Sequence, residues 1–342
     1  MAARHPLRFG VQLPLWDYAV HPEVSFASVR RTAALAEELG FDFVTVDDHL
    51  MRGEGGVFLE SWTVLSMLTA LTERVRFHTS VLCAVYRPPA LLAKMAATLD
   101  RAGGGRLELG LGAGWKSEEA EAYGYEWPAP RGRLDRLEEA VQVIRLLWTG
   151  GPVCFDGTHY ALRDAVCAPR PLQEPGPPLW IGGSGVKRTL RIAARYADGA
   201  SFGNPGAAPD GHAFDQFTFF AHRRDVLAAH CEAAGRDPGE LRLAVGVNLM
   251  AIGPRAGRAH RRVEQVARSA GASAHERGRA ASAAASAPRS LEEVQEQVAR
   301  FVALGATDVS LTRASPEAIA AFAEEVMPRF RRGVRSTVER SR

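Results

Sequence analysis

Cysteine is scarce in this chain, and the few cysteines stand far apart. The 342 residues include four cysteines, and no two of them form a CxxC pair (Cys83, Cys154, Cys167 and Cys231). This spacing argues against a structural zinc site and is typical of reduced thiols in a cytosolic protein. Long apolar runs are also missing: no stretch of about 18 apolar residues occurs, and the opening MAARHPLRFG has no signal-peptide core. We therefore expect a cytoplasmic protein without a membrane-spanning helix.

Lysine is almost absent. Only Lys94, Lys116 and Lys187 occur, so arginine carries nearly all of the positive charge, and the formal net charge is +3. No basic stripe is interleaved with aromatic residues, which argues against nucleic-acid binding. None of the three lysines lies inside a predicted strand, which disfavours a Schiff-base aldolase. The lack of clustered oxygen ligands likewise disfavours divalent-metal chemistry.

What the chain does have is a repeated alternation of short strand-like and longer helix-like segments. Strands are expected at 8–13, 41–46, 75–82, 106–111, 179–181, 199–202, 241–249 and 308–311, and helical patterns follow them. Eight such units predict an α/β protein with a (β/α)8 TIM barrel, forming a single domain over residues 1–342. A doubly wound parallel sheet is the alternative.

Two insertions interrupt the alternation, at about 125–178 and 253–289. The first contains an amphipathic helix at 133–148, a probable hairpin with strands at 153–155 and 159–162, and a proline-rich run. The second is rich in alanine, serine and arginine, which is typical of a mobile surface loop. The functional alternative for the second is a lid or basic wall over the barrel mouth.

Active sites of such barrels lie at the C-terminal ends of the strands. Those ends bring the following residues to the mouth: Trp16; Asp48 and His49; Ser80, Val81, Leu82 and Cys83; Gly112, Ala113, Gly114 and Trp115; Gly182, Gly183, Ser184 and Gly185. This set is poor in carboxylate pairs and rich in glycine. It favours a barrel that binds a flat, phosphorylated organic cofactor and lets the cofactor supply the chemistry.

The glycines at 110, 112 and 114 stand at alternate positions at the end of the fourth strand. The absence of Cβ atoms lets a ligand approach the main chain, although a tight strand-to-helix turn would also explain them. A dinucleotide fingerprint is excluded because Trp115 stands where its third glycine belongs, and no Gly-Lys-Ser/Thr of a P-loop follows. We interpret the stretch as a backbone-lined shelf.

A second glycine cluster and one histidine complete the candidate site. The sequence Gly182–Gly185 follows an apolar strand and precedes a helix, so its N–H groups can converge on a phosphate; a plain turn is the alternative. His49 is a candidate proton carrier or hydrogen-bond donor to a ring, or a structural histidine. Arg87 is either an anion contact or a solvated side chain.

Several of these segments together resemble the bacterial luciferase-like superfamily. The similarity rests on RFGVQL at 8–13, VDDHL at 46–50, the run VRFHTSVLCAVYRPPALLAKMAATLDRAGGGRLELGLGAGW at 75–115 with its continuation from Glu119 to Gly124, the helix RGRLDRLEEAVQVIRLLW at 131–148, and PPLWIGGSG at 177–185. Within the superfamily the chain is most similar to oxidoreductases that depend on the deazaflavin F420. The resemblance weakens between residues 253 and 288.

The resemblance implies a role for each motif. Asp48 and His49 would lie near the cofactor ring, with His49 close to its reactive edge. Ser80 and Val81 would form a bulge, often a non-proline cis peptide, behind the ring. The ring edge would be lined by Gly112, Ala113 and Gly114, and the phosphate would be held by Gly183, Ser184 and Gly185. Trp115 replaces the catalytic glutamate of the F420-dependent sugar-phosphate dehydrogenases, so it and Trp16 would form an aromatic pocket for a less polar substrate.

The function implied is hydride transfer from reduced F420 to a small organic substrate such as an enone or imine, with His49 as the proton donor or ring anchor. The alternative within the family is a monooxygenase that uses reduced FMN and O2, and the alternative from another class is a non-catalytic flavin-binding barrel. The expected partners are the small-molecule substrate, a second copy of the chain, and a separate flavin or F420 reductase that supplies reduced cofactor. The F420 tail ends in carboxylates, for which Arg188, Arg191 and the arginines of 255–279 are available.

Overall fold

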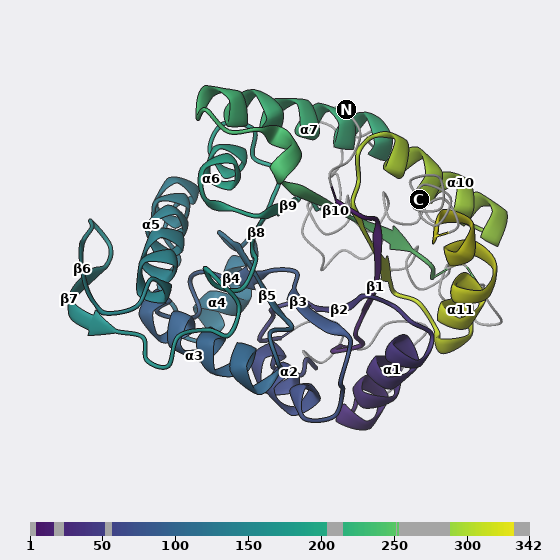
Figure 1. Cartoon of the computed structure of the whole chain (residues 1–342), viewed down its shortest axis with the longest axis horizontal. Helices are drawn as coiled ribbons and strands as arrows, with labels where there is room; N and C mark the ends of the chain where they lie inside the picture. Colours follow the sequence, from purple (N-terminus) through teal and green to yellow (C-terminus); the bar gives the residue numbers. More distant parts are fainter. Residues whose placement is uncertain are drawn as a thin grey trace, which may run out of the picture.

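The computed structural model of the chain describes residues 5–16, 24–51, 57–203, 215–250, 252 and 288–331. Parallel strands form a ring in the order β1 (Arg8–Gln12), β11 (Asp308–Thr312), β10 (Arg242–Asn248), β9 (Gly199–Ser201), β8 (Leu179–Gly182), β5 (Leu107–Gly112), β3 (Arg76–Thr79) and β2 (Phe43–Val46). Because β3 pairs with β5 and β2 pairs with β1, the sheet is closed (Figure 1). The (β/α)8 barrel is therefore confirmed, and the open doubly wound sheet is wrong.

The third strand of the barrel is broken near its end. The peptide bond between Ser80 and Val81 is cis, and the chain then resumes pairing with β5 as the two-residue strand β4 (Leu82–Cys83). The predicted strand at 75–82 is thus two strands separated by the bulge that the family resemblance implied.

Helices surround the barrel (Figure 1). They are α1 (Phe26–Glu38), α2 (Ser61–Thr69), α3 (Pro89–Ala102), α4 (Ser117–Ala122), α5 (Pro130–Trp148), α6 (Thr189–Tyr196), α7 (Gln216–Ala233), α10 (Leu291–Ala303) and α11 (Pro316–Ala321), with a 3-10 turn at Pro238–Glu240 and a π-helical turn at Phe322–Val326. Local signals set several starts: the side chains of Ser25, Ser290 and Ser315 each accept a hydrogen bond from an amide in the first helical turn. The predicted helix at 133–148 begins earlier, at Pro130, because proline fits the first turn of a helix.

The main apolar core lies between the strands and this ring of helices. Alternate strand residues point outward into it, including Leu107, Leu109 and Leu111 of β5, which are all buried. The residues between them point into the barrel, as expected for a period of two. Inward positions can therefore carry a different chemistry from the outward ones.

The inward residues at the N-terminal end of the barrel are charged. Arg8 donates two hydrogen bonds to Glu108 and one to Asp308, Arg76 contacts Glu108, and Arg242 contacts Asp308. Both carboxylates are almost completely buried. We call these five residues the charged floor; the carboxylates and guanidinium groups satisfy one another there and seal the barrel away from the mouth.

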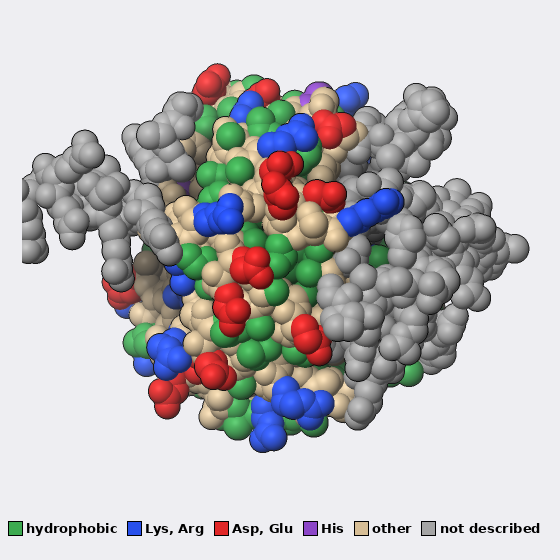
Figure 2. Space-filling view, turned by 90° about the vertical axis from the view of Figure 1, so that its right-hand side faces the viewer, with side chains coloured by type: hydrophobic (Ala, Val, Ile, Leu, Met, Phe, Trp, Pro, Cys, Tyr) green, Lys and Arg blue, Asp and Glu red, His purple; other side chains and the backbone are tan. Residues whose placement is uncertain are grey.

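The first insertion forms an antiparallel hairpin, as predicted, from β6 (Pro152–Asp156) and β7 (Ala161–Val166), and it projects beside α5 (Figure 1). Residues 253–287 of the second insertion lie outside the described residues, so its lid hypothesis stays untested. Figure 2 views the side on which α10 and α11 lie: among the described residues of that face, acidic and basic side chains are interspersed rather than gathered by sign. No described helix is long and apolar enough to cross a membrane.

Candidate active site

A cavity of about 480 Å³ opens at the C-terminal ends of the strands. It is lined by nearly every residue that the sequence pointed to: Trp16, Asp48, His49, Ser80, Val81, Leu82, Cys83, Gly112, Ala113, Gly114, Trp115, Gly182, Gly183 and Ser184. Gly185 alone of that set is not among the lining residues. Closure of the barrel thus brings together loops that are more than a hundred residues apart in sequence.

His49 is held by a carboxylate that the sequence did not single out. Its Nδ1 lies 2.7 Å from Oε1 of Glu119, in the first turn of α4, and both side chains are buried. The hydroxyl of Tyr86 donates to the same oxygen at 2.8 Å. Burial by itself raises the pKa of Glu119, but the hydrogen bond and charge of His49 and the hydrogen bond from Tyr86 outweigh it and hold that pKa below its usual range. Glu119 is therefore an anion beneath the imidazole.

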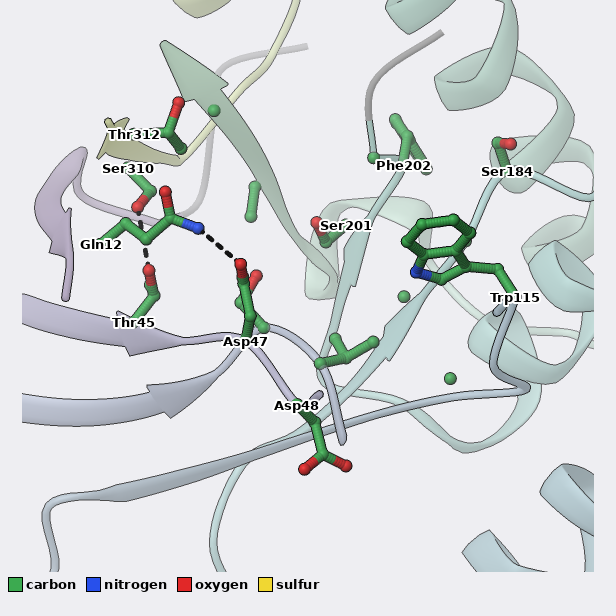
Figure 3. Close-up of a pocket in the computed structure, with 18 of the residues that line it drawn as sticks. Gln12, Thr45, Asp47, Asp48, Trp115, Ser184, Ser201, Phe202, Ser310 and Thr312 are labelled. Atoms are coloured by element: carbon green, nitrogen blue, oxygen red, sulfur yellow. Dashed lines mark hydrogen bonds between the residues drawn. The ribbon is translucent and has the colours of Figure 1, made fainter. Parts of the chain in front are cut away.

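Aromatic rings enclose the other sides of His49. Trp115 and Phe58 each meet the imidazole edge-on, with ring centroids 5.6 and 5.5 Å away. Trp115 is 40% exposed, and its indole projects into the cavity (Figure 3). Trp16 pairs with Phe58 through an isolated β-bridge. The two tryptophans predicted for the substrate pocket therefore lie on the same side as His49.

Asp48, the neighbour of His49, is turned away to other partners. Its carboxylate accepts hydrogen bonds from the Ser61 hydroxyl, the Cys83 amide and both terminal nitrogens of Arg87. Figure 3 shows this carboxylate directed away from the other labelled residues. Arg87 also contacts Glu60, and its side chain is only 12% exposed. The hypotheses of Arg87 as a solvated or anion-binding side chain are therefore wrong; it neutralises Asp48.

The glycine shelf makes room for Val81. A Cβ atom on Gly182 would lie 2.5 Å from a methyl of Val81, and one on Gly110 or Gly112 would lie 2.9 Å from a Val81 methyl. The cis peptide at Ser80–Val81 thus places the valine side chain over three glycines of β5 and β8. Gly112 and Gly182 still line the cavity, so the shelf consists of backbone with Val81 set on it.

Gly114 and Cys83 close the same edge of the cavity. Gly114 has a positive φ of 76°, and a Cβ there would lie 2.6 Å from the Cys83 sulfur. Burial raises the pKa of the Cys83 thiol to about 12. Cys83 is therefore a neutral packing residue and not a nucleophile.

The second glycine cluster leads from β8 into α6. Gly183 has a φ of 132°, and its amide donates to the Ser201 carbonyl, so this N–H is not available to an anion. Thr189, the first residue of α6, also lines the cavity. Arg223 of α7 donates from Nε to the Ser184 carbonyl and brings a positive charge to the loop. The start of α6 and the nearby charge of Arg223 favour an anion at this loop.

A polar wall that the sequence did not reveal faces these groups across the cavity. Gln12 donates from Nε2 to Asp47 at 2.9 Å, and the hydroxyls of Thr45 and Ser310 are 3.3 Å apart (Figure 3). The sequence signal that could have revealed this wall is the period of two along β1, β2 and β11, which turns these polar residues into the barrel. Their polarity marks the inner surface of the mouth.

A buried histidine lies at the inner end of the cavity. His78 is 1% exposed, lines the cavity, and has no hydrogen-bond partner for either ring nitrogen among the described residues. Its ring lies against that of Trp180 with the ring centroids 4.6 Å apart and the planes tilted by 37°. Burial lowers its pKa to about 4, and the nearby carboxylates of Glu108 and Asp308 offset that effect only in part. His78 is therefore neutral at physiological pH.

Comparison with known proteins identifies the family. The family model of the luciferase-like monooxygenases matches residues 11–335. The chain belongs to this family. Solved structures with the same fold include an F420-dependent secondary alcohol dehydrogenase in complex with an F420–acetone adduct (24% identical, TM-score 0.77, covering 94% of this chain and 98% of that one) and the F420-dependent tetrahydromethanopterin reductase of Methanopyrus kandleri (19%, TM-score 0.70, 95% and 99%). The monooxygenase RslO1 of Streptomyces bottropensis is also similar (23%, TM-score 0.73, 95% and 100%).

Curated relatives are more similar in sequence but over shorter segments. An F420-dependent glucose-6-phosphate dehydrogenase of Microbacterium testaceum is 39% identical over 197 residues, which are 57% of this chain and 56% of that protein. A protein of the same name from Beutenbergia cavernae is 41% identical over 168 residues, 48% of this chain and 49% of that protein. The matched segments thus span about half the length of these relatives. Among the described residues, no group of three or more His, Cys, Asp or Glu side chains is placed to hold a metal ion.

Proposed function

We propose that this luciferase-like protein is an oxidoreductase that binds F420 and transfers hydride between this cofactor and a small organic substrate. The observation that carries the proposal is a cavity that is lined by His49, by Trp115 and by the loop at Gly183 and Ser184. The names of the curated relatives, which are F420-dependent dehydrogenases, support the choice of cofactor.

The residues of the cavity fit a deazaflavin with a phosphate. A volume of about 480 Å³ lies within the roughly 300–1,000 Å³ of small-molecule sites. The Gly183–Ser184 loop, Thr189 and the charge of Arg223 suit a phosphate, and the backbone shelf with Val81 suits the face of a flat ring. Polar side chains of the opposite wall, led by Gln12 and Asp47, offer hydrogen bonds to heteroatoms.

Reduced F420 supplies a hydride, and the protein has to supply the accompanying proton and exclude water. We assign the proton to His49, which lines the cavity and whose Nδ1 is bound to Glu119, so that Nε2 is left to exchange the proton. Reduction of a carbonyl, enone or imine would consume the hydride and one proton from Nε2; oxidation of an alcohol would return that proton to the same atom. Trp115 and Phe58 pack edge-on against the imidazole of His49, which is 6% exposed, and so limit its contact with water.

Trp115 separates this protein from the sugar-phosphate dehydrogenases that it resembles. An indole cannot act as the acid that the glutamate of those enzymes provides, and it narrows the space beside His49. We therefore propose a less polar substrate than glucose 6-phosphate for this chain, with an enone or imine as the acceptor class.

The test is a titration of the purified protein with F420 and, separately, with FMN, followed by fluorescence in the oxidised and reduced forms. We expect micromolar or tighter binding of F420 and much weaker binding of FMN. Turnover of reduced F420 with cyclohex-2-enone and of oxidised F420 with glucose 6-phosphate then distinguishes the substrate classes. A preference for reduced FMN would overturn the cofactor assignment and favour the monooxygenase, as in the structural neighbour from Streptomyces bottropensis. Binding of neither would favour a barrel without this activity.

The proposal has consequences for partners and location. A cofactor that leaves oxidised must be reduced elsewhere, so we propose a separate F420 reductase in the same cytoplasmic compartment. A homodimer is proposed from the family resemblance, and analytical ultracentrifugation tests it. A single sedimenting species with the 37.0 kDa mass of one chain would contradict the homodimer.

A further inference from the structure

Glu119 collects more hydrogen bonds than a helix-surface glutamate would. Its Oε1 accepts from His49 Nδ1 at 2.7 Å and from the Tyr86 hydroxyl at 2.8 Å. Its Oε2 lies 3.3 and 3.4 Å from the amides of Leu50 and Met51. The side chain is 2% exposed. Four hydrogen-bond donors therefore surround this buried carboxylate, and they need a side chain with two acceptor oxygens at this position.

Asp48 is unable to perform this role although it is adjacent to His49 in the sequence. Its two oxygens are occupied by Arg87, Ser61 and the Cys83 amide. Glu119 reaches His49 instead from a helix 70 residues further along the chain. The two carboxylates therefore have different roles: Asp48 is neutralised by Arg87, and Glu119 faces the imidazole of His49.

We propose that Glu119 is the positioning residue of the site: together with Tyr86 it fixes His49 as the Nδ1–H tautomer and stabilises the imidazolium, so that Nε2 alternates between acceptor and donor toward the cavity. A carboxylate bound to Nδ1–H leaves the lone pair of the neutral ring on Nε2. When the ring is protonated, the negative charge 2.7 Å away offsets the new positive charge. The expected effect on enzyme activity rests on the proposed function, whereas the expected effect on the His49 tautomer does not.

The other groups around the imidazole do not compete for this role. Trp115 and Phe58 present ring edges and carry no charge. Tyr86 donates to Glu119, and burial together with the hydrogen bond to Glu119 and the charge of that carboxylate raises the pKa of Tyr86, so it stays a protonated donor. In the segment that precedes His49, Asp47 accepts a hydrogen bond from the side-chain amide of Gln12, and Asp48 is paired with Arg87. Cys83 is a neutral thiol, and Lys116 lines the same cavity beyond Trp115.

The experiment compares Glu119→Gln with Glu118→Gln, its exposed neighbour in the same helical turn, and with Tyr86→Phe. The first readout is the ¹⁵N shift pattern of the His49 imidazole in the full chain without cofactor. We expect the Nδ1–H tautomer in the wild type and in Glu118→Gln. We expect a mixture of both tautomers in Glu119→Gln, because a carboxamide has one acceptor oxygen for four donors and adds donors of its own.

The second readout is the pH profile of hydride transfer with the loaded enzyme. Glu119→Gln should lower kcat by roughly 10- to 100-fold, less than the roughly 10²- to 10⁴-fold typical of losing the acid itself in His49→Ala. In the reduction direction His49 must be protonated, so the alkaline limb of the Glu119→Gln profile should move to lower pH, while KM for the cofactor changes little. Tyr86→Phe should show the same trends in weaker form, and Glu119→Asp should restore part of the rate.

The two readouts separate the failure of this inference from that of the proposed function. An unchanged tautomer in Glu119→Gln would overturn the positioning role whatever the cofactor is. A changed tautomer in a protein that binds no F420 would leave the positioning role standing and refute the proposed cofactor. A Glu119→Gln chain that does not fold would be replaced by Tyr86→Phe, where an unchanged tautomer and an unchanged pH profile together would contradict the proposal.

Discussion

At the scale of single residues, Val81 determines which amino acids can stand around it. Its side chain lies over the backbone of Gly110, Gly112 and Gly182, where added Cβ atoms would come within 3 Å of its methyl groups or of the neighbouring backbone. From the sequence, these glycines were interpreted as making room for a ligand. The structure shows that a valine side chain takes part of that space, so these positions are constrained even without a ligand.

This packing predicts a destabilised Gly182→Ala variant and a compensating second change. The new Cβ would lie 2.5 and 2.7 Å from the two Val81 methyls, and overpacking of this kind costs about 1–3 kcal/mol of unfolding free energy. Urea unfolding checks the value. The double variant Gly182→Ala/Val81→Ala removes both methyls, leaving a contact of 3.2 Å to the Cβ, and should recover most of the loss. If the double variant were less stable than the sum of the two single changes predicts, steric contact with Val81 would not be the cause.

At the scale of elements, the strands of the barrel form layers of different chemistry along its axis. Above the charged floor lies a layer with Phe43, His78 and Trp180 in ring contact, and Gly10 leaves space for Phe43. Above that layer stand the glycines and small polar residues of the cavity. The element β3 therefore contributes Arg76 to the floor, His78 to the aromatic layer and, at its end, the bulge that supports the site.

The aromatic layer predicts how stability depends on pH. The pKa of His78 is about 4 in the folded chain and 6.5 ordinarily, so the unfolded chain binds the extra proton first as the pH falls. The contribution of neutral His78 to the free energy of unfolding is fully present above pH 6.5 and is lost as the pH falls toward 4. At 1.36 kcal/mol for each unit of pKa shift, the loss is about 3 kcal/mol. Denaturant unfolding at several pH values should show this loss.

The comparison variant is His78→Phe, which keeps an aromatic ring in the layer but cannot be protonated. Its unfolding free energy should change less between pH 6.5 and 4 than that of the wild type, whereas His222→Phe on the exposed surface of α7 should follow the wild type. Equal slopes for His78→Phe and the wild type would show that His78 is not the group responsible.

At the scale of the whole molecule, the charged floor ties the first strand of the barrel to the last and to the middle. Arg8 on β1 reaches Asp308 on β11 and Glu108 on β5, which are 300 and 100 residues away. Burial alone raises the pKa of Glu108, but the hydrogen bonds and charge of Arg8 outweigh it and lower that pKa to about 2. The closed barrel thus depends on ion pairs whose partners come from distant parts of the chain.

Arg8→Met is predicted to destabilise the whole barrel. Removing one partner leaves two buried carboxylates with fewer counter-charges, which costs about 3–5 kcal/mol at neutral pH. The depressed pKa of Glu108 means that this contribution is present above its ordinary pKa of 4.5 and is lost as the pH falls toward 2. Chemical unfolding should therefore show a large difference from the wild type at pH 7 that shrinks below pH 4.5. Arg163→Met, which breaks the exposed pair with Asp156, should have little effect at either pH. A difference that is independent of pH would contradict the electrostatic account.

The sequence by itself determined the elements and the edge of the barrel that carries the site. Apolar periodicity marks each strand and helix because one face of each must be buried, and eight alternating units favour a parallel barrel. The doubly wound sheet that the sequence left open is excluded only by the pairing of β3 with β5. Residues at strand ends, such as His49 and Trp115, could therefore be placed at the mouth before the structure was known. The hairpin and the break near Ser80 followed from turn residues and from family resemblance.

Only the tertiary structure decided which side chains meet. Glu119 pairs with His49, Arg87 pairs with Asp48, and Arg8 pairs with Asp308 because strand order, register and inward direction bring them within hydrogen-bond distance. No local pattern encodes such pairs: Glu119 has the same sequence surroundings as exposed Glu118, and only the fold turns one of them inward. The chemistry of the site thus depends on contacts between elements that the sequence determines one at a time.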